Sequence, residues 1–138
     1  MIRRLVLLAA LILLAACGNP QRSDLKLLDE TLDQFASTVR WGTPEQLVAF
    51  IDPDSLKDRP VRDFDLERLR QLRVASFRVD PPVVFEENRA RQTGQVDLVN
   101  VNTQQMRSAI ETSEWRWDPT AKRWWLVSGL PRFAGDGR

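Results

Sequence analysis

Carboxylates are the side chains of this chain that could carry out acid–base chemistry. The sequence has no histidine and no tyrosine, and its 138 residues include one cysteine, Cys17. Without histidine, the commonest general base and metal ligand is missing. A zinc site would have to be built from carboxylates alone, which is unusual. We therefore predict no cofactor and no metal site, and we expect the domain to fold without a metal ion.

Glu111 is the carboxylate whose position best suits acid–base chemistry. A turn over residues 102–105 would pair Val101 with Met106 in two long antiparallel strands, and this register places Val96 opposite Glu111. The neighbouring residues on that face are apolar. Burial on such a face raises the pKa of a carboxyl group, which could then abstract a proton. This is the enzymatic interpretation of Glu111.

A second interpretation of Glu111 follows from the apolar residues on both sides of it. Ile110 and Trp115 point to opposite faces of a regular strand, so both could enter one core only through a β-bulge between them. Such a bulge would turn Glu111 toward solvent. This interpretation is favoured, so Glu111 is predicted to be solvated or ion-paired, and the chain is predicted not to be an enzyme.

Four tryptophans lie close together near the end of the chain. A loop over residues 119–122 would pair Trp117 with Trp124 and place Trp115, Trp117 and Trp124 on one face of a hairpin, with Trp125 on the other face beside Arg116. We predict that the three-tryptophan face is core beneath the first helix of the domain. The rival interpretation is an open pocket for an apolar ligand.

The N-terminus carries a targeting signal. Residues 1–4 form a short basic head, and residues 5–16 are a continuous apolar run, shorter than the roughly 20 residues that span a bilayer. This pattern is typical of a signal peptide helix. Leu14-Ala15-Ala16-Cys17 resembles the bacterial lipobox. The resemblance implies a diacylglycerol on the Cys17 thiol, cleavage before Cys17 and a fatty acyl chain such as palmitate on the new amino group.

The lipobox resemblance also implies an address. Aspartate after the lipidated cysteine favours the inner membrane in lipoproteins of enterobacterial type, whereas Gly18 follows here. The expected location is the inner leaflet of the outer membrane, facing the periplasm. An ordinary signal peptide cut elsewhere, which would leave a free Cys17, is the alternative. The mature chain has 18 basic and 19 acidic residues, and this near-neutral charge argues against a nucleic-acid partner despite the arginines between the tryptophans.

The chain is predicted to comprise a signal peptide (1–16), a lipidated tether (17–23), one α+β domain (24–131) and a loose tail (132–138). Ser23 and Thr43 are predicted to cap helices, and Gly42 to end the first one. The acidic stretch over residues 52–65 is expected to be mostly solvated loop. Helices are predicted at 25–39, 44–51 and 65–72, followed by strands at 75–79, 83–85, 89–101, 106–118 and 123–128.

Helices followed by long antiparallel strands predict an α+β fold with N-terminal helices on one face of a curved sheet. This order resembles the NTF2-like (cystatin-like cone) superfamily, and residues 115–131 are similar to uncharacterised lipoproteins of proteobacteria. Another α+β sheet, cystatin-like or lipocalin-like, is the alternative. The expected function is a non-enzymatic, lipid-anchored periplasmic module that binds an envelope protein or a small apolar ligand. A cone enzyme and a purely structural lipoprotein are the alternatives.

Overall fold

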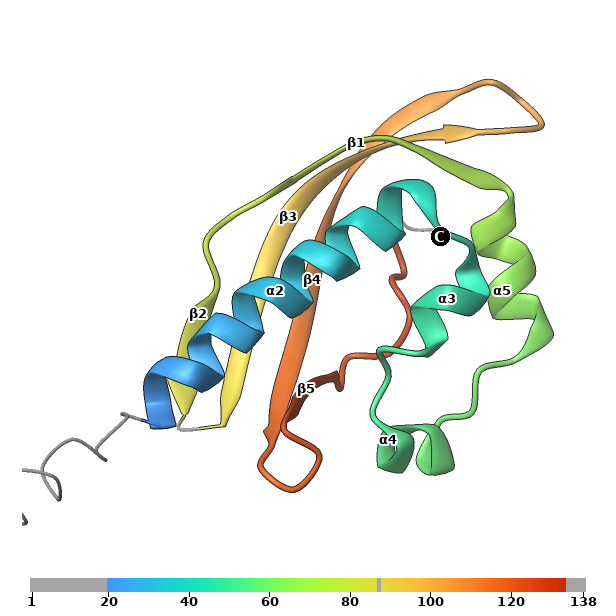
Figure 1. The fold of residues 1–138 in the computed structure, drawn as a ribbon. Helices are drawn as coiled ribbons and strands as arrows, with labels where there is room; N and C mark the ends of the chain where they lie inside the picture. Colours follow the sequence, from blue (N-terminus) through green and yellow to red (C-terminus); the bar gives the residue numbers. More distant parts are fainter. Residues whose placement is uncertain (1–19, 87, 134–138) are drawn as a thin grey trace, which may run out of the picture.

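The computed structural model describes residues 20–86 and 88–133, so Cys17 and the rest of the lipobox lie outside the described residues. The fold is α+β, as predicted, with helices packed against a curled antiparallel half-barrel sheet (Figure 1). Its helices are α2 (Pro20–Trp41), α3 (Pro44–Val48), α4 (Pro53–Asp58) and α5 (Asp63–Arg70), and its strands are β1 (Leu72–Val79), β2 (Val83–Glu86), β3 (Arg89–Asn100), β4 (Met106–Asp118) and β5 (Arg123–Leu126).

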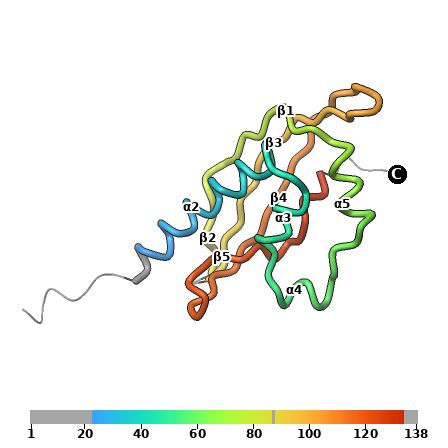
Figure 2. Tube along the Cα trace, turned by 45° about the vertical axis from the view of Figure 1, so that its right-hand side comes forward, coloured from blue at the N-terminus to red at the C-terminus, as the bar shows by residue number. Residues whose placement is uncertain are grey.

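Helix α2 lies across the concave face of the sheet (Figure 2). Its apolar residues recur every three or four positions and are buried: Leu28, Leu32, Phe35 and Val39. The helix begins at Pro20, so the predictions that residues 20–23 are tether and that Ser23 is the N-cap are wrong. Proline suits the first turn, where its missing N–H costs no hydrogen bond.

Gly42 ends α2, as predicted. Its N–H donates to the Thr38 carbonyl at 2.8 Å. A methyl group on this residue would lie 2.7 Å from the same carbonyl oxygen, so the close approach requires glycine. The Thr43 cap is also confirmed, because Gln46 returns its side-chain oxygen to the Thr43 N–H at 2.9 Å.

The short helices differ from the prediction. Helix α3 ends at Val48 instead of residue 51, and α5 spans Asp63–Arg70 instead of 65–72. The acidic stretch over residues 52–65, expected to be mostly loop, contains α4, which is capped by Asp52 and has Pro53 at its first position. An aspartate followed by a proline at the first helical position favours a helix start, and this local signal predicts α4 even without apolar periodicity.

The strands form one sheet in the order β1-β3-β4-β5, and β2 continues along the edge of β3 beyond β1. Two irregularities curl this edge. The pairing of β1 shifts between Val74 and Ser76, and that of β2 shifts between Val84 and Glu86. A bulge increases the local twist and bend of a strand, which helps the sheet to wrap around α2.

The predicted register of β3 and β4 is wrong by two residues. Val99 pairs with Met106, so Glu111 stands opposite Gly94 instead of Val96. The connecting turn is longer than predicted because the Asn100 side chain accepts hydrogen bonds from the N–H groups of residues 102 and 103, at 2.9 and 3.0 Å. A shift of two residues leaves every side chain on its predicted face.

The hairpin of β4 and β5 has the predicted register, with Trp117 opposite Trp124 and Trp115 opposite Leu126. The core lies between this hairpin, the rest of the concave face and α2. Its largest fully buried side chains include Trp115, Trp124, Phe35 and Leu28. The chain between α3 and α4 joins the outer edge of β5 through a parallel bridge between Ile51 and Leu126.

Candidate functional site

The three-tryptophan face is packed core, as predicted. Trp115 is 0% exposed, Trp124 2% and Trp117 9%. The Phe35 ring meets the Trp115 ring edge-on, with centroids 5.1 Å apart. The indole N–H groups are also satisfied within this core, since Trp115 donates to Ser113 at 2.9 Å and Trp124 to the Asp24 carbonyl at 2.8 Å. Neither cavity described below is lined by these tryptophans.

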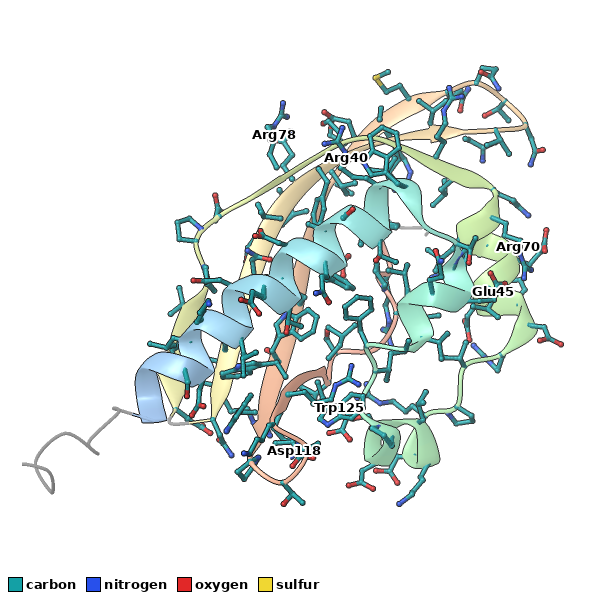
Figure 3. The ribbon with its side chains drawn as sticks, in the orientation of Figure 1. Arg40, Glu45, Arg70, Arg78, Asp118 and Trp125 are labelled. Atoms are coloured by element: carbon teal, nitrogen blue, oxygen red, sulfur yellow. The ribbon has the colours of Figure 1, made fainter. Side chains whose placement is uncertain are left out.

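Trp125 occupies the opposite, convex face and is half-buried, as expected. The predicted partner of its ring was Arg116, but the guanidinium that lies over it belongs to Arg123, at 3.7 Å from the ring centroid. The Trp125 N–H donates to Asp118 at 3.3 Å, and these two side chains lie together at the hairpin end (Figure 3). The Arg116 guanidinium instead forms an ion pair with Asp52.

Glu111 differs from its favoured interpretation. Strand β4 pairs with β3 in one continuous register, without a bulge between Ile110 and Trp115. Ile110 is therefore 62% exposed on the convex face, and Glu111 lies half-buried on the concave side. Its carboxylate forms no ion pair with any described residue but accepts the Phe133 backbone N–H at 3.2 Å. The prediction of a solvated or ion-paired Glu111 is wrong, because β4 has no bulge here. The regular strand exposes Ile110 and keeps Glu111 on the concave side.

The surroundings of Glu111 act on its pKa in two directions. Burial raises the pKa of the carboxyl group and is the larger effect. Hydrogen bonds from the backbone of Phe133 and Arg132, together with the positive charge of Arg132, lower it in part. The direction agrees with the enzymatic interpretation. The hydrogen bonds show that Glu111 also holds the C-terminal segment in place.

The C-terminal segment, residues 127–133, is part of the domain. The prediction of a loose tail is wrong for residues 132 and 133, and residues 134–138 lie outside the described part of the chain. Phe133 is 3% exposed and inserts into the core with a φ of 40°. A positive φ is unfavourable for phenylalanine, so burial of the ring and the bond to Glu111 must hold it there.

A cavity of about 370 Å³ opens between the connection from α4 to α5 and the C-terminal segment, a volume in the range of small-molecule sites. Its floor includes the buried side chains of Ile51 and Pro131. We call it the arginine cavity, because four arginines and one aspartate supply its charged lining. The lining residues are Ile51, Ser55, Arg59, Pro60, Val61, Arg62, Asp65, Arg68, Ser128, Gly129, Leu130, Pro131 and Arg132.

Among the described residues, only one of the four arginines that line the arginine cavity forms an ion pair with a carboxylate. Arg62 pairs with Asp65 at 3.1 Å, and this pairing lowers the pKa of the aspartate. Arg59 donates to the Val127 carbonyl at 3.3 Å, which ties the two walls together. Among the described residues, no carboxylate forms an ion pair with Arg59, Arg68 or Arg132. The cavity therefore presents an excess of positive charge that suits an anion.

A buried ion pair supports the wall of this cavity. Asp52 is 4% exposed and receives two hydrogen bonds from the Arg116 guanidinium, at 2.7 and 2.9 Å. Its other carboxylate oxygen accepts the Asp54 N–H at 3.0 Å and so caps α4. Asp52 was expected to be solvated within the acidic stretch. The Asp-Pro pair signals a cap, but the partnership with Arg116 has no sequence signal.

A second cavity, of about 340 Å³, lies on the other side of Phe133. Its walls come from the end of α2, from α3, α5 and β1, and they include the apolar side chains of Val39, Leu47 and Leu69. Arg70 of α5 and Glu45 of α3 point toward one another and form an ion pair at its edge (Figure 3). Because this arginine is matched, the second cavity has no excess charge to select an anion.

Two further findings concern the part of the chain that the structure describes. It contains no cluster of three or more potential metal-binding side chains. It also contains no helix that is both long and apolar enough to span a bilayer.

No protein-family model, no characterised protein and no solved structure matches the chain.

Proposed function

We propose that this chain is a lipid-anchored, non-enzymatic module of the bacterial cell envelope that binds an anionic ligand in the arginine cavity. The observation that carries the proposal is the gathering of Arg59, Arg68 and Arg132, without ion pairs to described carboxylates, around a partly apolar cavity. Guanidinium groups bind carboxylates and phosphates through two parallel hydrogen bonds. The ligand class is a carboxylate or phosphate attached to an apolar body.

The remaining parts of the proposal concern anchor, location and fold. The lipobox ending at Cys17 supports lipidation, and Gly18 after it supports the outer membrane with the domain facing the periplasm. Helices on the concave face of a curled sheet support an NTF2-like cone. The non-enzymatic assignment is supported by Glu111, because the Phe133 amide occupies its carboxylate and the Phe133 ring is buried in the core beside it.

Ligand binding is tested by titration calorimetry with phenyl phosphate, which combines an anion with a small apolar body. The lipoprotein is purified in detergent. We expect saturable binding that weakens as salt rises, and no binding of the uncharged control benzyl alcohol. Arg68→Ala/Arg132→Ala should weaken binding by at least about tenfold, since a charged hydrogen bond contributes about 1.5–3 kcal/mol.

The matched control is Arg40→Ala/Arg73→Ala, which removes two exposed arginines outside the cavity. It should leave both binding and melting temperature nearly unchanged. Equal weakening in the two double variants would show nonspecific attraction to positive charge. Absence of binding to the unaltered protein would reject an anion site of this class.

Lipidation has a separate test. Cys17→Ser removes the thiol that would receive the diacylglycerol. We expect this variant to accumulate as an uncleaved precursor that incorporates no labelled palmitate. A correctly processed, labelled product would contradict the anchoring at Cys17, while leaving the arginine cavity untouched as a binding site.

A further inference from the structure

Strand β2 presents an apolar surface to solvent. Three successive residues are exposed, with Val83 at 63%, Val84 at 44% and Phe85 at 46%. Val79, at the end of β1, is 40% exposed and precedes them across a two-proline break. We call Val79, Val83, Val84 and Phe85 the β2 surface. Proteins usually protect such an edge strand with charged residues, so an uncovered apolar edge indicates a partner.

The β2 surface lies at the end of the molecule where α2 begins (Figures 1 and 2). Helix α2 starts at Pro20, three residues after Cys17. A fully extended chain spans at most about 3.6 Å per residue, so the start of α2 lies within roughly 11 Å of the Cys17 Cα. If Cys17 is acylated, as proposed above, this end of the domain is held next to the bilayer.

The charges beside β2 are largely paired, and Asp80, between Val79 and the two prolines, adds one exposed carboxylate. Arg91 lies over the Phe85 ring, 5.3 Å from its centroid, and pairs with Glu114 at 2.7 Å. Arg89 stands opposite Glu86 in the strand register. The surface therefore combines aliphatic and aromatic side chains with no strong net charge, which permits contact with the apolar boundary of a bilayer.

We infer that the β2 surface docks on the lipid bilayer that carries the Cys17 acyl chains. Val83 and Phe85 would enter the boundary between headgroups and acyl chains. This inference rests on the proposed anchoring and adds an orientation to it. Helix α5 lies at the far end of α2, away from the docked end (Figure 1), and it lines the arginine cavity through Asp65 and Arg68. The cavity thus faces a ligand arriving from the aqueous compartment.

A second copy of this chain is the rival occupant of the β2 surface. Two edge strands can pair through their backbones. Here the strand has four residues, and its pairing already shifts between Val84 and Glu86. A bulge interrupts the regular ladder that strand pairing needs, which favours lipid as the occupant.

The test uses the processed lipoprotein in vesicles of phosphatidylethanolamine and phosphatidylglycerol. Acylation consumes the Cys17 thiol, so Glu86→Cys provides one reactive thiol at the end of β2, and Gln105→Cys provides the control in the exposed turn between β3 and β4. Each receives the fluorophore NBD, and the vesicles contain lipids with a nitroxide quencher near the headgroup. We expect strong quenching at position 86 and little at position 105.

Two double substitutions then test the side chains. In the Glu86→Cys background, Val83→Ser/Phe85→Ser should abolish the quenching. Met106→Ser/Ile110→Ser removes two apolar side chains that are similarly exposed, at 69% and 62%, on β4 and should preserve it. Quenching should also persist in high salt, because the contact is apolar.

The alternatives give different results. Protein that floats with the vesicles but shows no quenching at position 86 would overturn the docking and leave the anchoring intact. Crosslinking between two copies through position 86, without quenching, would overturn the docking in favour of a dimer. Protein that fails to float would overturn both the docking and the anchoring on which it rests.

Discussion

Two regions of the domain, called here the hairpin end and the arginine end, satisfy their polar and charged side chains in different ways. At the hairpin end, where β4 meets β5, three tryptophans are buried, and the indole N–H groups of Trp115 and Trp124 find partners within the domain. At the arginine end, where α4, α5 and the C-terminal segment meet, three of four arginines form no ion pair with a described carboxylate. A region whose polar groups are hydrogen-bonded within the domain contributes stability, whereas a region with an excess of positive charge is suited to binding an anion.

The hairpin end should show the largest effect of substitution. Trp117→Ala removes a buried indole, and truncating a buried tryptophan typically costs about 3–5 kcal/mol. This loss is a large share of the stability of a small domain. Trp125→Ala, on the half-buried convex face, should cost much less. Urea denaturation followed by circular dichroism measures both, and equal costs would remove the distinction between the two faces.

The next largest loss of stability is expected at the Asp52–Arg116 ion pair, which joins the hairpin end to the arginine end. Asp52→Ala removes the cap of α4 and leaves Arg116 without its carboxylate, so we expect a loss of about 2–3 kcal/mol, below the cost for a fully buried pair because Arg116 is partly exposed. The same denaturation experiment measures it. Asp54→Ala, which breaks only an exposed pair with Lys57, is the control and should change stability little.

Asp52→Ala also tests whether the arginine cavity depends on the Asp52–Arg116 pair. Because Asp52 positions α4 beside the arginine cavity, the variant should weaken phenyl phosphate binding as well as stability. Unaltered binding in a clearly destabilised protein would show that the cavity does not depend on this pair.

The smallest effect is a pH dependence at Glu111. Burial raises its folded-state pKa above the ordinary value near 4.5, so protonation favours the folded state. The contribution is fully present below pH 4.5 and is lost as pH rises through the raised pKa. Glu111→Gln should remove this decline, because the neutral amide can still accept the Phe133 N–H. Denaturation of both proteins between pH 4 and pH 8 measures it.

Asp97→Asn is the control, because the pKa of Asp97 is shifted in the opposite direction to that of Glu111. Hydrogen bonds from Ser108 and Ser76 lower the pKa of Asp97, so its contribution is present above the unfolded-state pKa and is lost as pH falls through the folded-state value. If Glu111→Gln and Asp97→Asn changed the pH profile in the same direction, the buried environment of Glu111 would be contradicted.

Local patterns in the sequence predicted the long regular elements but missed the short helix α4. Apolar residues at helical spacing predicted the body of α2, and alternation in the last hairpin predicted that Trp115 and Trp117 of β4 face the core. The hairpin register followed from its loop length and from the charges of Asp118 and Arg123 at its mouth. The bulge predicted between Ile110 and Trp115 is absent, because β4 exposes Ile110 to solvent.

The α+β class, the register of the last hairpin and the tryptophan core could be predicted from the residues alone, because each depends on neighbours within one element or one hairpin. The surroundings of Glu111, the Asp52–Arg116 pair and the arginine cavity appear only in the folded domain. Their members come from segments far apart in the chain, such as Arg59 and Arg132. Ion pairs and cavities between such segments have no period or spacing to reveal them, because they form only when the helices and the C-terminal segment have packed on the sheet.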